Sequence, residues 1–316
     1  MKVKKSTPIY ISGHKGMVGS AIYRTLNSAG YKNIIVKTRN ELDLTNQQSV
    51  KYFFERNKPE VVINAAAMVG GILANNKFPY RFIMKNMQIQ NNLIDESFKS
   101  GVRKFIFLGS SCIYPKFSPQ PIREEYILNG NLEETNEPYA VAKIAGIKMC
   151  QSFNIQHKTD FRAVMPTNLF GPNDNYDPSN SHVLAALTKK ILTAKKQNKK
   201  TVTIWGNGKP KREFLHVDDF AKASIKVMSI SKRNYQNICG EENHFLNVGY
   251  GKEINIKDLA SLIANISNYK GKFIYDNSRP NGTMTKLIDS SKIFKLGWKP
   301  KISLKSGIVS IIQELI

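Results

Sequence analysis

Residues 11–21 read ISGHKGMVGSA, and this stretch decides the predicted fold. It follows a short apolar run and leads into a segment of helical period, so Gly13, Gly16 and Gly19 fall where a strand turns into a helix. Glycine suits this position because the turn is tight, the backbone approaches a pyrophosphate, and the helix packs closely on the sheet. The spacing is GxxGxxG, not GxGxxG, and a plain strand-to-helix turn is the alternative. The flanking strand and amphipathic helix favour a dinucleotide-binding turn.

Outward from this turn, strand-length apolar runs alternate with helical segments. This alternation predicts an α/β fold, a Rossmann-type doubly wound parallel sheet with a smaller C-terminal α/β substrate lobe. Helices are predicted at Met17–Ala29, ending at Gly30, and at Gln47–Arg56, where Thr45 and Gln48 have capping-box spacing. The predicted strands, rich in Val, Ile and Phe as suits strands covered on both faces, are Pro8–Ser12, Asn33–Thr38, Val61–Ala67, Lys104–Ser110, Phe161–Pro166, Val202–Trp205 and Phe245–Val248.

The end of the second predicted strand indicates which dinucleotide is bound. NAD-specific sites place a carboxylate there, whereas this chain has Lys37-Thr38-Arg39-Asn40. The guanidinium of Arg39 suits a 2′-phosphate, and Lys15 adds a second positive charge, so NADPH/NADP+ is the predicted cofactor. A solvated surface arginine is the alternative for Arg39. The predicted cofactor contacts from these two segments are Gly13, His14, Lys15, Gly16, Met17, Val18, Gly19, Arg39 and Asn40.

The fourth predicted strand and a later helix carry residues that suit carbonyl chemistry. The strand ends in Leu108-Gly109-Ser110-Ser111-Cys112, and Tyr139 and Lys143 follow at a spacing that puts both on one helix face. A phenol with a pKa near 10 is a poor acid at neutral pH, but a nearby ammonium is expected to lower that value. We therefore predict Ser110, Tyr139 and Lys143 as catalytic residues. Leu108, Gly109, Ser110, Ser111 and Lys143 are also predicted cofactor contacts.

The net charge of +23 raises the possibility of nucleic-acid binding. The excess is spread along the chain, which favours solvated lysines and predicts no nucleic-acid partner, although one or two could meet an anionic substrate. The densest cluster lies on a predicted helix and the loop after it, and comprises Lys189, Lys190, Lys195, Lys196, Lys199 and Lys200.

Cysteine usage and hydropathy limit the cellular setting. Cys112, Cys150 and Cys239 form no CxxC pair and have no histidine at ligand spacing, so no disulfide framework and no metal site are predicted. No run approaches the roughly 18 apolar residues that span a bilayer. We expect a cytoplasmic protein with no membrane partner.

The predicted domain boundary follows from a loss of regularity. Residues 172–180 are rich in Pro, Asp, Asn and Ser, as are loops that often carry substrate contacts. We expect an NADP-binding Rossmann domain at 1–172 and mainly a substrate-binding lobe at 173–316. Segments 213–231, which include FLHVDDFAKASIKVM (214–228), and 244–250 are expected to return to the main sheet.

Together these motifs resemble the extended short-chain dehydrogenase/reductase family. The closest resemblance is to the branch that epimerises GDP-4-keto-6-deoxy-D-mannose at C3 and C5 and reduces C4 with NADPH, which gives GDP-L-fucose. The resemblance implies this reaction here, in a homodimer that pairs the helices Asn76–Ser100 and Tyr139–Gln156. It rests on GHKGMVGSA (13–21), LGSSCIYP (108–115), NEPYAVAKIAGIK (136–148), MPTNLFGP (165–172), PSNSHV (178–183) and REFLHVDD (212–219).

The resemblance also implies residue roles. Cys112 and His182 match the family's acid and base, and a thiolate and a neutral imidazole can both exchange protons near working pH. The ordinary alternatives are a small buried cysteine and a helix-capping or surface histidine. Pro166, Thr167, Asn168, Leu169 and His182 would line the nicotinamide end of the cofactor. Lys190, Trp205, Arg212 and Lys286 would hold the nucleotide sugar, with Trp205 as a core residue the alternative.

Several positions depart from the pattern of that branch. Lys15 replaces an arginine and so loses its bidentate fork, Asn281 replaces an aspartate, and Met284-Thr285 replaces proline-arginine. These departures put the fit to the exact sugar in question. Another GDP-linked 4-keto sugar, such as a heptose, is therefore an alternative substrate.

Other activities fit the residues less well. Reduction alone would not require both Cys112 and His182. A UDP-sugar 4-epimerase would hold NAD, against which Arg39 argues. A 4,6-dehydratase would need an acidic residue where Ser111 and Cys112 stand. A non-catalytic cofactor sensor or nucleic-acid binder would be expected to lose the serine, tyrosine and lysine set.

Overall fold

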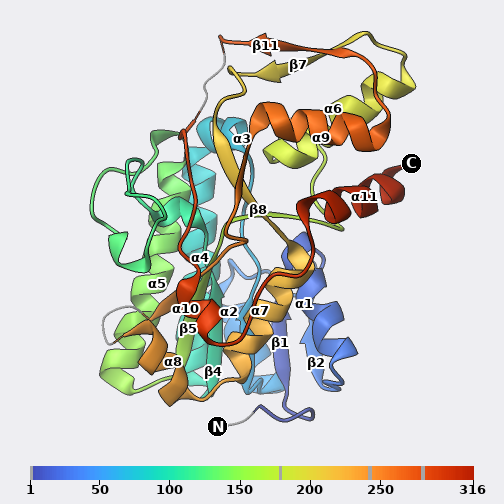
Figure 1. The fold of residues 1–316 in the computed structure, drawn as a ribbon. Helices are drawn as coiled ribbons and strands as arrows, with labels where there is room; N and C mark the ends of the chain where they lie inside the picture. Colours follow the sequence, from blue (N-terminus) through green and yellow to red (C-terminus); the bar gives the residue numbers. More distant parts are fainter. Residues whose placement is uncertain (1–2, 178–179, 241–243, 279–281) are drawn as a thin grey trace.

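The main sheet has six parallel strands in the order β2-β1-β3-β4-β5-β9 (Figure 1). The computed structural model describes residues 3–177, 180–240, 244–278 and 282–316. The chain runs from β1 to β2 on one side and continues from β3 on the other, so the carboxyl ends of β1 and β3 flank the switch point at which ligands bind in such sheets. The six strands are β1 (Ile9–Ser12), β2 (Ile34–Val36), β3 (Val61–Asn64), β4 (Lys104–Leu108), β5 (Phe161–Pro166) and β9 (Phe245–Val248).

Helices cover both faces of this sheet because successive strand residues point to opposite sides. On one face, Ile9 and Ile11 join a core that includes Phe220, and on the other Tyr10 packs with Phe53. The first face carries α1 (Met17–Ser28) and α7 (Val217–Ser229). The second carries α2 (Gln47–Asn57), α4 (Pro79–Lys99) and α5 (Glu137–His157). The predicted doubly wound α/β fold is confirmed.

A third apolar core lies beyond the carboxyl edge of the sheet, in the upper part of Figure 1. Strands β6 (Asn168–Phe170), β8 (Lys211–His216) and β10 (Glu253–Asn255) form a three-stranded sheet, and β7 (Thr201–Trp205) pairs with β11 (Lys272–Asp276). The helices of this core are α6 (Val183–Lys196), α9 (Ile256–Ser267) and α11 (Leu304–Leu315). The shorter elements are α3 (Ile72–Lys77), α8 (Lys232–Cys239), α10 (Ser291–Lys295), η1 (Ser111–Ile113), η2 (Glu124–Tyr126) and η3 (Glu134–Asn136).

The expectation that the strand within 214–228 returns to the main sheet is wrong. That strand, β8, pairs with β6 and β10, because the free edge of β5 is already occupied by β9. The helix that follows it, α7, does pack against the main sheet. The two segments therefore divide at His216, the N-cap residue of α7.

Local boundaries also differ from the sequence prediction. Helix α2 is capped by Asn46, whose Oδ1 accepts a hydrogen bond from the Ser49 N–H at 2.9 Å, whereas the predicted cap Thr45 donates its hydroxyl to Asp43. The predicted helix 76–100 is interrupted at Phe78, after which a proline opens α4. Strands β2, β3 and β4 each end earlier than predicted.

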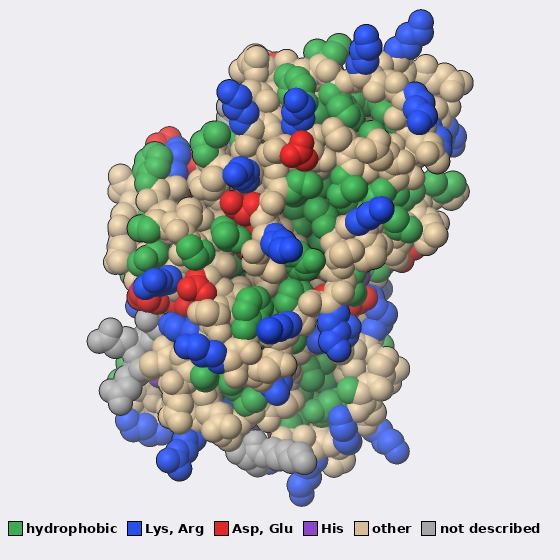
Figure 2. All heavy atoms as spheres, viewed as in Figure 1, with side chains coloured by type: hydrophobic (Ala, Val, Ile, Leu, Met, Phe, Trp, Pro, Cys, Tyr) green, Lys and Arg blue, Asp and Glu red, His purple; other side chains and the backbone are tan. Residues whose placement is uncertain are grey.

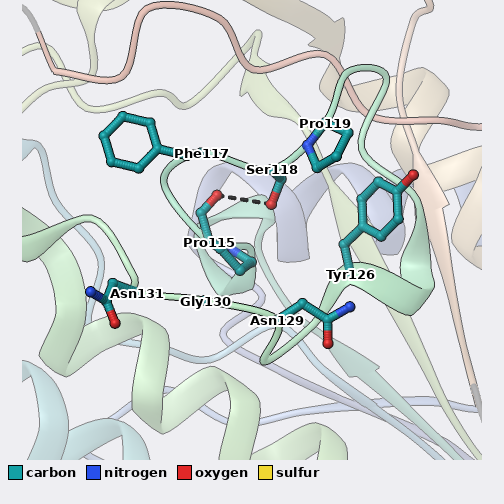
Figure 3. Close-up of a pocket in the computed structure, with 8 residues that line it drawn as sticks. All are labelled: Pro115, Phe117, Ser118, Pro119, Tyr126, Asn129, Gly130 and Asn131. Atoms are coloured by element: carbon teal, nitrogen blue, oxygen red, sulfur yellow. Dashed lines mark hydrogen bonds between the residues drawn. The ribbon is translucent and has the colours of Figure 1, made fainter.

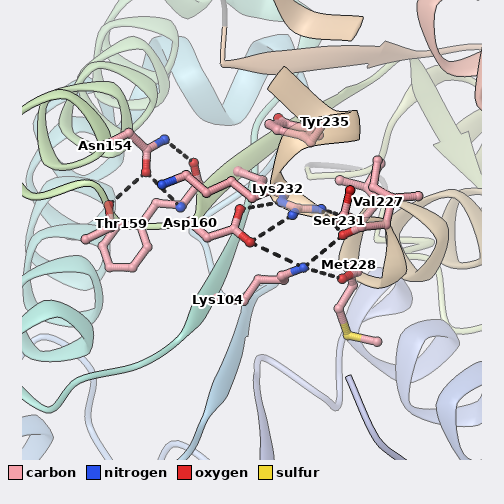
Figure 4. A network of polar contacts seen from close by, with 12 residues as sticks. Lys104, Asn154, Thr159, Asp160, Val227, Met228, Ser231, Lys232 and Tyr235 are labelled. Atoms are coloured by element: carbon pink, nitrogen blue, oxygen red, sulfur yellow. Dashed lines mark hydrogen bonds and ion pairs between the residues drawn. The ribbon is translucent and has the colours of Figure 1, made fainter. Parts of the chain in front are cut away.

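A buried polar network fastens the amino-terminal ends of β4 and β5 to the end of α7 (Figure 4). Arg162, which is 0% exposed, donates to both carboxylate oxygens of Asp160 at 2.6 and 2.8 Å. Lys104 Nζ lies 3.4 Å from the same carboxylate and donates to the carbonyl of Met228 at 2.7 Å. Burial lowers the pKa of Lys104 to about 8. One carboxylate thus serves two largely buried cations.

We expect Asp160→Asn to lower the free energy of unfolding by about 3–5 kcal/mol, because Arg162 and Lys104 would lose their shared countercharge. Urea unfolding followed by circular dichroism measures this change. The control is Asp95→Asn, which removes an exposed pair with Lys99 and should change stability by less than about 1 kcal/mol. Equal losses for the two variants would show that the buried network contributes no more than a surface pair.

The net positive charge is spread over the face that Figure 2 shows. Figure 2 shows Lys and Arg side chains scattered over the visible face, with fewer Asp and Glu side chains between them. The lysine cluster at 189–200 falls on α6 and the segment that follows it, as predicted. In the part of the chain that the structure describes, none of the helices has both the length and the apolar composition needed to cross a membrane.

Candidate active site

The glycine-rich turn joins β1 to α1 at the carboxyl edge of the main sheet. Gly13 has a φ of 72°, in the left-handed region, and a Cβ there would lie 2.8 Å from the backbone of Ala65. A Cβ on Gly19 would lie 2.2 Å from the Gly13 carbonyl oxygen. Only glycine fits at these two positions, because the turn packs directly against β3 on one side and α1 on the other. The predicted strand, turn and helix are all present.

The start of α1 suits a phosphate group. Its N-cap residue, Gly16, supplies no side-chain hydrogen bond, which leaves the first-turn N–H groups available to an anion. The Nδ1 atom of His14 is buried and has no hydrogen-bond partner among the described residues, as expected of a polar atom that a bound molecule satisfies. Arg39 and Asn40 are exposed beyond β2, which pairs in parallel with β1. These residues fit the predicted dinucleotide.

Ser110 and Cys112 follow β4 at the same edge of the sheet. The Ser110 hydroxyl oxygen accepts a hydrogen bond from the Cys112 N–H at 3.3 Å and so caps the short turn η1. Cys112 is half-buried, and its Sγ accepts a hydrogen bond from Asn136 Nδ2 at 3.3 Å. The ordinary role of a fully buried cysteine fits Cys150 and Cys239, but not Cys112.

Tyr139 and Lys143 lie one turn apart on α5 and face the end of β4. Lys143 Nζ donates to the carbonyl of Leu108 at 2.8 Å and lies 5.8 Å from the Tyr139 ring centroid. The Tyr139 ring packs edge-on against Phe82, with ring centroids 6.2 Å apart, and its hydroxyl is hydrogen-bonded to Ser110. The structure therefore brings together Ser110, Tyr139 and Lys143, as the sequence predicts.

The expected lowering of the Tyr139 pKa is wrong, because the pKa is raised. Burial raises the pKa of Tyr139 above its ordinary value, the negative charge of Cys112 adds to this, and the hydrogen bond to Ser110 partly opposes it. Burial also lowers the pKa of Lys143 to about 8, and its Nζ donates a hydrogen bond to the Leu108 carbonyl. The phenol is therefore protonated at neutral pH, but the raised pKa makes it a weaker acid than a free tyrosine, so burial alone does not activate Tyr139.

Arg212 reaches the site from β8. Its Nη1 donates to the carbonyl of Thr283 at 2.6 Å. Burial lowers the pKa of Arg212, whereas the charges of Glu253, Cys112 and Glu133 act in the opposite direction. Arg212 and Cys112 are therefore close enough to interact, and the guanidinium is partly desolvated where an acidic ligand would meet it.

A pocket of about 340 Å³ lies between the segment 116–120 and the residues 282–285. Met284 and Thr285, two of the positions that depart from the family pattern, line it, and Met284 is 51% exposed. Lys286 follows, with its N–H bonded to Glu253 Oε1 at 3.0 Å. These two departures thus face a pocket beside Arg212, while Asn281 lies outside the described residues.

Lys190 and Trp205 form a second group, on α6 and β7. Lys190 Nζ lies 4.7 Å from the centroid of the Trp205 ring and donates to the carbonyl of Thr203 at 3.3 Å. Trp205 is 42% exposed, so the alternative that it is a core residue is wrong. Burial lowers the pKa of Lys190. An ammonium above an accessible indole face offers both charge and a flat apolar surface.

His182 is the N-cap residue of α6, but its side chain makes no capping hydrogen bond. The side chain is accessible to solvent, yet the surrounding protein lowers its pKa by desolvation, so the neutral imidazole is favoured at neutral pH. Within the described ranges, the structure records no direct contact between His182 and Cys112. A pair that acts on opposite faces of a sugar would be separated by that sugar. Of the motif at 178–183, Pro178 and Ser179 lie outside the described residues.

The segment after β5 is fixed by a residue that the sequence analysis missed. Thr167 Oγ1 and Asn168 Nδ2 donate to the carbonyl of Glu213 at 3.2 and 2.9 Å, next to Pro166 and Leu169. The Glu213 carboxylate is fully buried and accepts hydrogen bonds from the N–H groups of Gly251 and Ile288. Burial raises its pKa. No local pattern marks this residue, because its partners come from distant loops.

A larger pocket, of about 410 Å³, lies in the segment that follows η1 (Figure 3). It is lined by Pro115, Phe117, Tyr126 and the chain at 129–131, and the Ser118 hydroxyl donates to the carbonyl of Pro115 beside it. None of the sequence-predicted site residues lines this pocket. It shares Phe117 and Ser118 with the smaller pocket at 282–285.

Comparison with known proteins agrees with this geometry. Residues 9–248, most of the chain, match the NAD dependent epimerase/dehydratase family. The chain belongs to this family. Among its curated members, GDP-L-fucose synthase 1 of Arabidopsis thaliana is 50% identical over 304 residues, which cover 96% of this chain and 91% of that protein. GDP-L-fucose synthase of Escherichia coli (strain K12) is 48% identical over 305 residues, with 96% and 95% covered.

A solved structure supports the same assignment. The GDP-mannoheptose C4 reductase MlghC of Campylobacter jejuni, with NADP bound, superimposes with a TM-score of 0.89 at 38% identity and covers 99% of each chain. Because the superposition covers 99% of this chain, it includes the main sheet with its two apolar cores and the third core.

Proposed function

We propose that this chain is a GDP-L-fucose synthase, which epimerises GDP-4-keto-6-deoxy-D-mannose at C3 and C5 and reduces it at C4 with NADPH. The observation that carries the proposal is the meeting of Tyr139, Ser110 and Cys112 at the carboxyl edge of the sheet, where a proton donor and a thiol face one ligand position. The names of the curated relatives specify the sugar nucleotide.

In the reduction, Tyr139 donates a proton to the oxygen at C4 while Ser110 holds that oxygen by a hydrogen bond. Tyr139 carries the proton at neutral pH, and its hydrogen bond to Ser110 fixes the direction of the hydroxyl. When Tyr139 gives up its proton, the ammonium of Lys143, which is buried beside it, stabilises the phenolate that forms. When bound, NADPH supplies the reducing equivalents for the ketone.

In the epimerisation, Cys112 and His182 move protons at C3 and C5. The C4 ketone acidifies both neighbouring C–H bonds, and inversion needs a base on one face and an acid on the other. A half-buried thiol and an accessible neutral imidazole meet that need. Arg212, Lys190, Trp205 and Lys286 would hold the nucleotide sugar, as charge and an open indole face allow.

The assembly and the division of labour are part of the same proposal. Residues 1–172, with α7 and β9, would bind NADPH, and most of 173–316 would bind the sugar nucleotide. We propose a cytoplasmic homodimer in which α4 and α5 of two copies pair, with no nucleic-acid partner. Analytical ultracentrifugation tests the dimer directly.

The experiment that tests the function is NADPH oxidation with GDP-4-keto-6-deoxy-D-mannose in deuterated water, followed by NMR of the product. GDP-L-fucose labelled at C3 and C5 supports both halves of the proposal. Oxidation without label would restrict the chain to reduction. If NADPH is not oxidised, the proposed substrate is wrong.

A GDP-linked heptose is the second candidate substrate. Met284 and Thr285 line the pocket beside Arg212 and replace residues typical of fucose synthases, and a heptose C4 reductase is among the structural relatives. Comparing kcat/KM for the corresponding 4-keto heptose and for the 6-deoxy sugar decides between the two.

The cofactor preference makes a separate prediction. Arg39→Ala should raise KM for NADPH about 10- to 100-fold and leave KM for NADH nearly unchanged, because a charged hydrogen bond to the 2′-phosphate contributes about 1.5–3 kcal/mol. Initial rates with each dinucleotide measure this. Arg56→Ala, an exposed arginine on α2, is the control. Equal effects on both dinucleotides would mean that Arg39 does not contact the 2′-phosphate.

A further inference from the structure

Asn136 occupies a helix-capping position without capping its helix. Asparagine is among the best N-cap residues because its side-chain oxygen accepts a first-turn N–H. Asn46 and Asn255 do this here, accepting from Ser49 and Asp258 at 2.9 and 2.7 Å. Asn136, at the start of α5, makes no such bond.

The amide of Asn136 is directed at Cys112 instead. Its Nδ2 donates to Cys112 Sγ at 3.3 Å, across 24 residues of sequence. Its Oδ1 is buried and has no partner among the described residues. Because buried amides are normally hydrogen-bonded at both ends, this arrangement leaves one acceptor for a group that arrives from outside the chain.

An N–H donor favours the deprotonated form of the sulfur to which it bonds. Two titratable groups also face Cys112, namely Tyr139 from α5 and Arg212 from β8, and both interact with it electrostatically. They oppose one another in sign, because the arginine attracts a thiolate and a phenolate would repel it. Asn136 differs from both, since it is in direct hydrogen-bond contact with the sulfur and fixes its direction.

We propose that Asn136 is a positioning residue for Cys112. It holds the sulfur toward the sugar and favours its deprotonated form, and its Oδ1 accepts a hydrogen bond from a hydroxyl group of the bound sugar. The inference rests on the proposed function, in which Cys112 transfers a proton. The effect of Asn136 on the sulfur can nevertheless be measured without any substrate.

The first test is the pH dependence of Cys112 alkylation by iodoacetamide, located by peptide mass spectrometry. Cys150 and Cys239 are buried, so the two sites serve as internal references. In Asn136→Asp a carboxylate replaces the donor, and the midpoint of the alkylation profile should move up by about one pH unit or more. Serine can cap the helix but reaches the sulfur less well than asparagine. In Asn136→Ser the alkylation midpoint should therefore also move up, but by less than in Asn136→Asp. Asn46→Ala, at a true cap, should lower thermal stability and leave the midpoint unchanged.

The second test is deuterium incorporation at C3 and C5 of the substrate. We expect Asn136→Ser to lower it about tenfold or more, with the pH profile displaced as in the alkylation experiment. Unshifted midpoints in both Asn136 variants, in a wild-type enzyme that does incorporate label, would overturn this inference and leave the proposed function intact. Shifted midpoints with no label in the wild-type enzyme would overturn the epimerase function and keep Asn136 as the partner of Cys112.

Discussion

Tyr139→Phe is expected to lower kcat for NADPH oxidation about a thousandfold, within the range of 10²–10⁴ that a positioned general acid contributes. The substitution removes only the hydroxyl that is hydrogen-bonded to Ser110 and keeps the ring that packs against Phe82. Phenylalanine has no proton to donate at any pH, so the loss should not be recovered between pH 6 and 8. Stopped-flow absorbance at saturating sugar nucleotide measures the rate.

The binding of NADPH separates this loss from misfolding. We expect its dissociation constant, measured by fluorescence, to stay within about threefold of the wild-type value, because the hydroxyl acts on the substrate oxygen. Tyr235→Phe on α8 is the matched control, since it removes a buried hydroxyl that donates to the carbonyl of His244 at 2.8 Å. A fall in kcat shared by both variants, or full activity of Tyr139→Phe, would exclude Tyr139 as the acid.

The main sheet could be predicted because its determinants are local. Five of the six strands are short, fully buried runs, and the turn at Gly13 and Gly19 is fixed by backbone approaches that admit no side chain. Alternating strand and helix periods then leave few arrangements other than a parallel sheet with helices on both faces.

The sequence predictions were wrong where more than one local structure suits the sequence and tertiary packing selects one of them. Asn46 and Thr45 are both acceptable caps, and the choice depends on the hydroxyl of Thr45 already bonding Asp43. Strand β8 carries an apolar run like those of the main sheet, but β9 fills the place beside β5. No residue within 211–216 indicates that β9, and not β8, pairs with β5.

In the candidate site, too, local features could be predicted from the sequence and those that depend on tertiary packing could not. Ser110, Tyr139 and Lys143 follow from spacing along one strand end and one helix. The direction of the Tyr139 pKa shift does not, because it depends on how deeply the assembled fold buries the phenol. Asn136 and Glu213 were missed because their partners are distant in sequence, although Asn136 does stand in the motif that contains Tyr139.

Cys112→Ser should reduce deuterium incorporation at C3 and C5 of GDP-4-keto-6-deoxy-D-mannose about a hundredfold or more. An alcohol holds its proton far more tightly than a thiol, whose pKa is about 8.5 in a peptide, so serine cannot act as the base. NMR of substrate incubated in deuterated water without NADPH measures exchange separately from reduction. The control is Cys150→Ala, on the face of α5 that packs into the apolar core, which should leave exchange unchanged.

The C4 reduction catalysed by Cys112→Ser provides a second test of this prediction. Because Tyr139 and Ser110 remain in place, Cys112→Ser should still oxidise NADPH slowly and yield a sugar reduced at C4 but not inverted at C3 and C5. Its NADPH dissociation constant should equal that of the wild-type enzyme, since Cys112 contacts Asn136 and not the cofactor turn. Exchange at the wild-type rate would remove Cys112 from proton transfer and leave His182 to act with another base. Loss of exchange and of C4 reduction together, in a folded variant that binds NADPH, would mean that inversion is required before Tyr139 can protonate the oxygen.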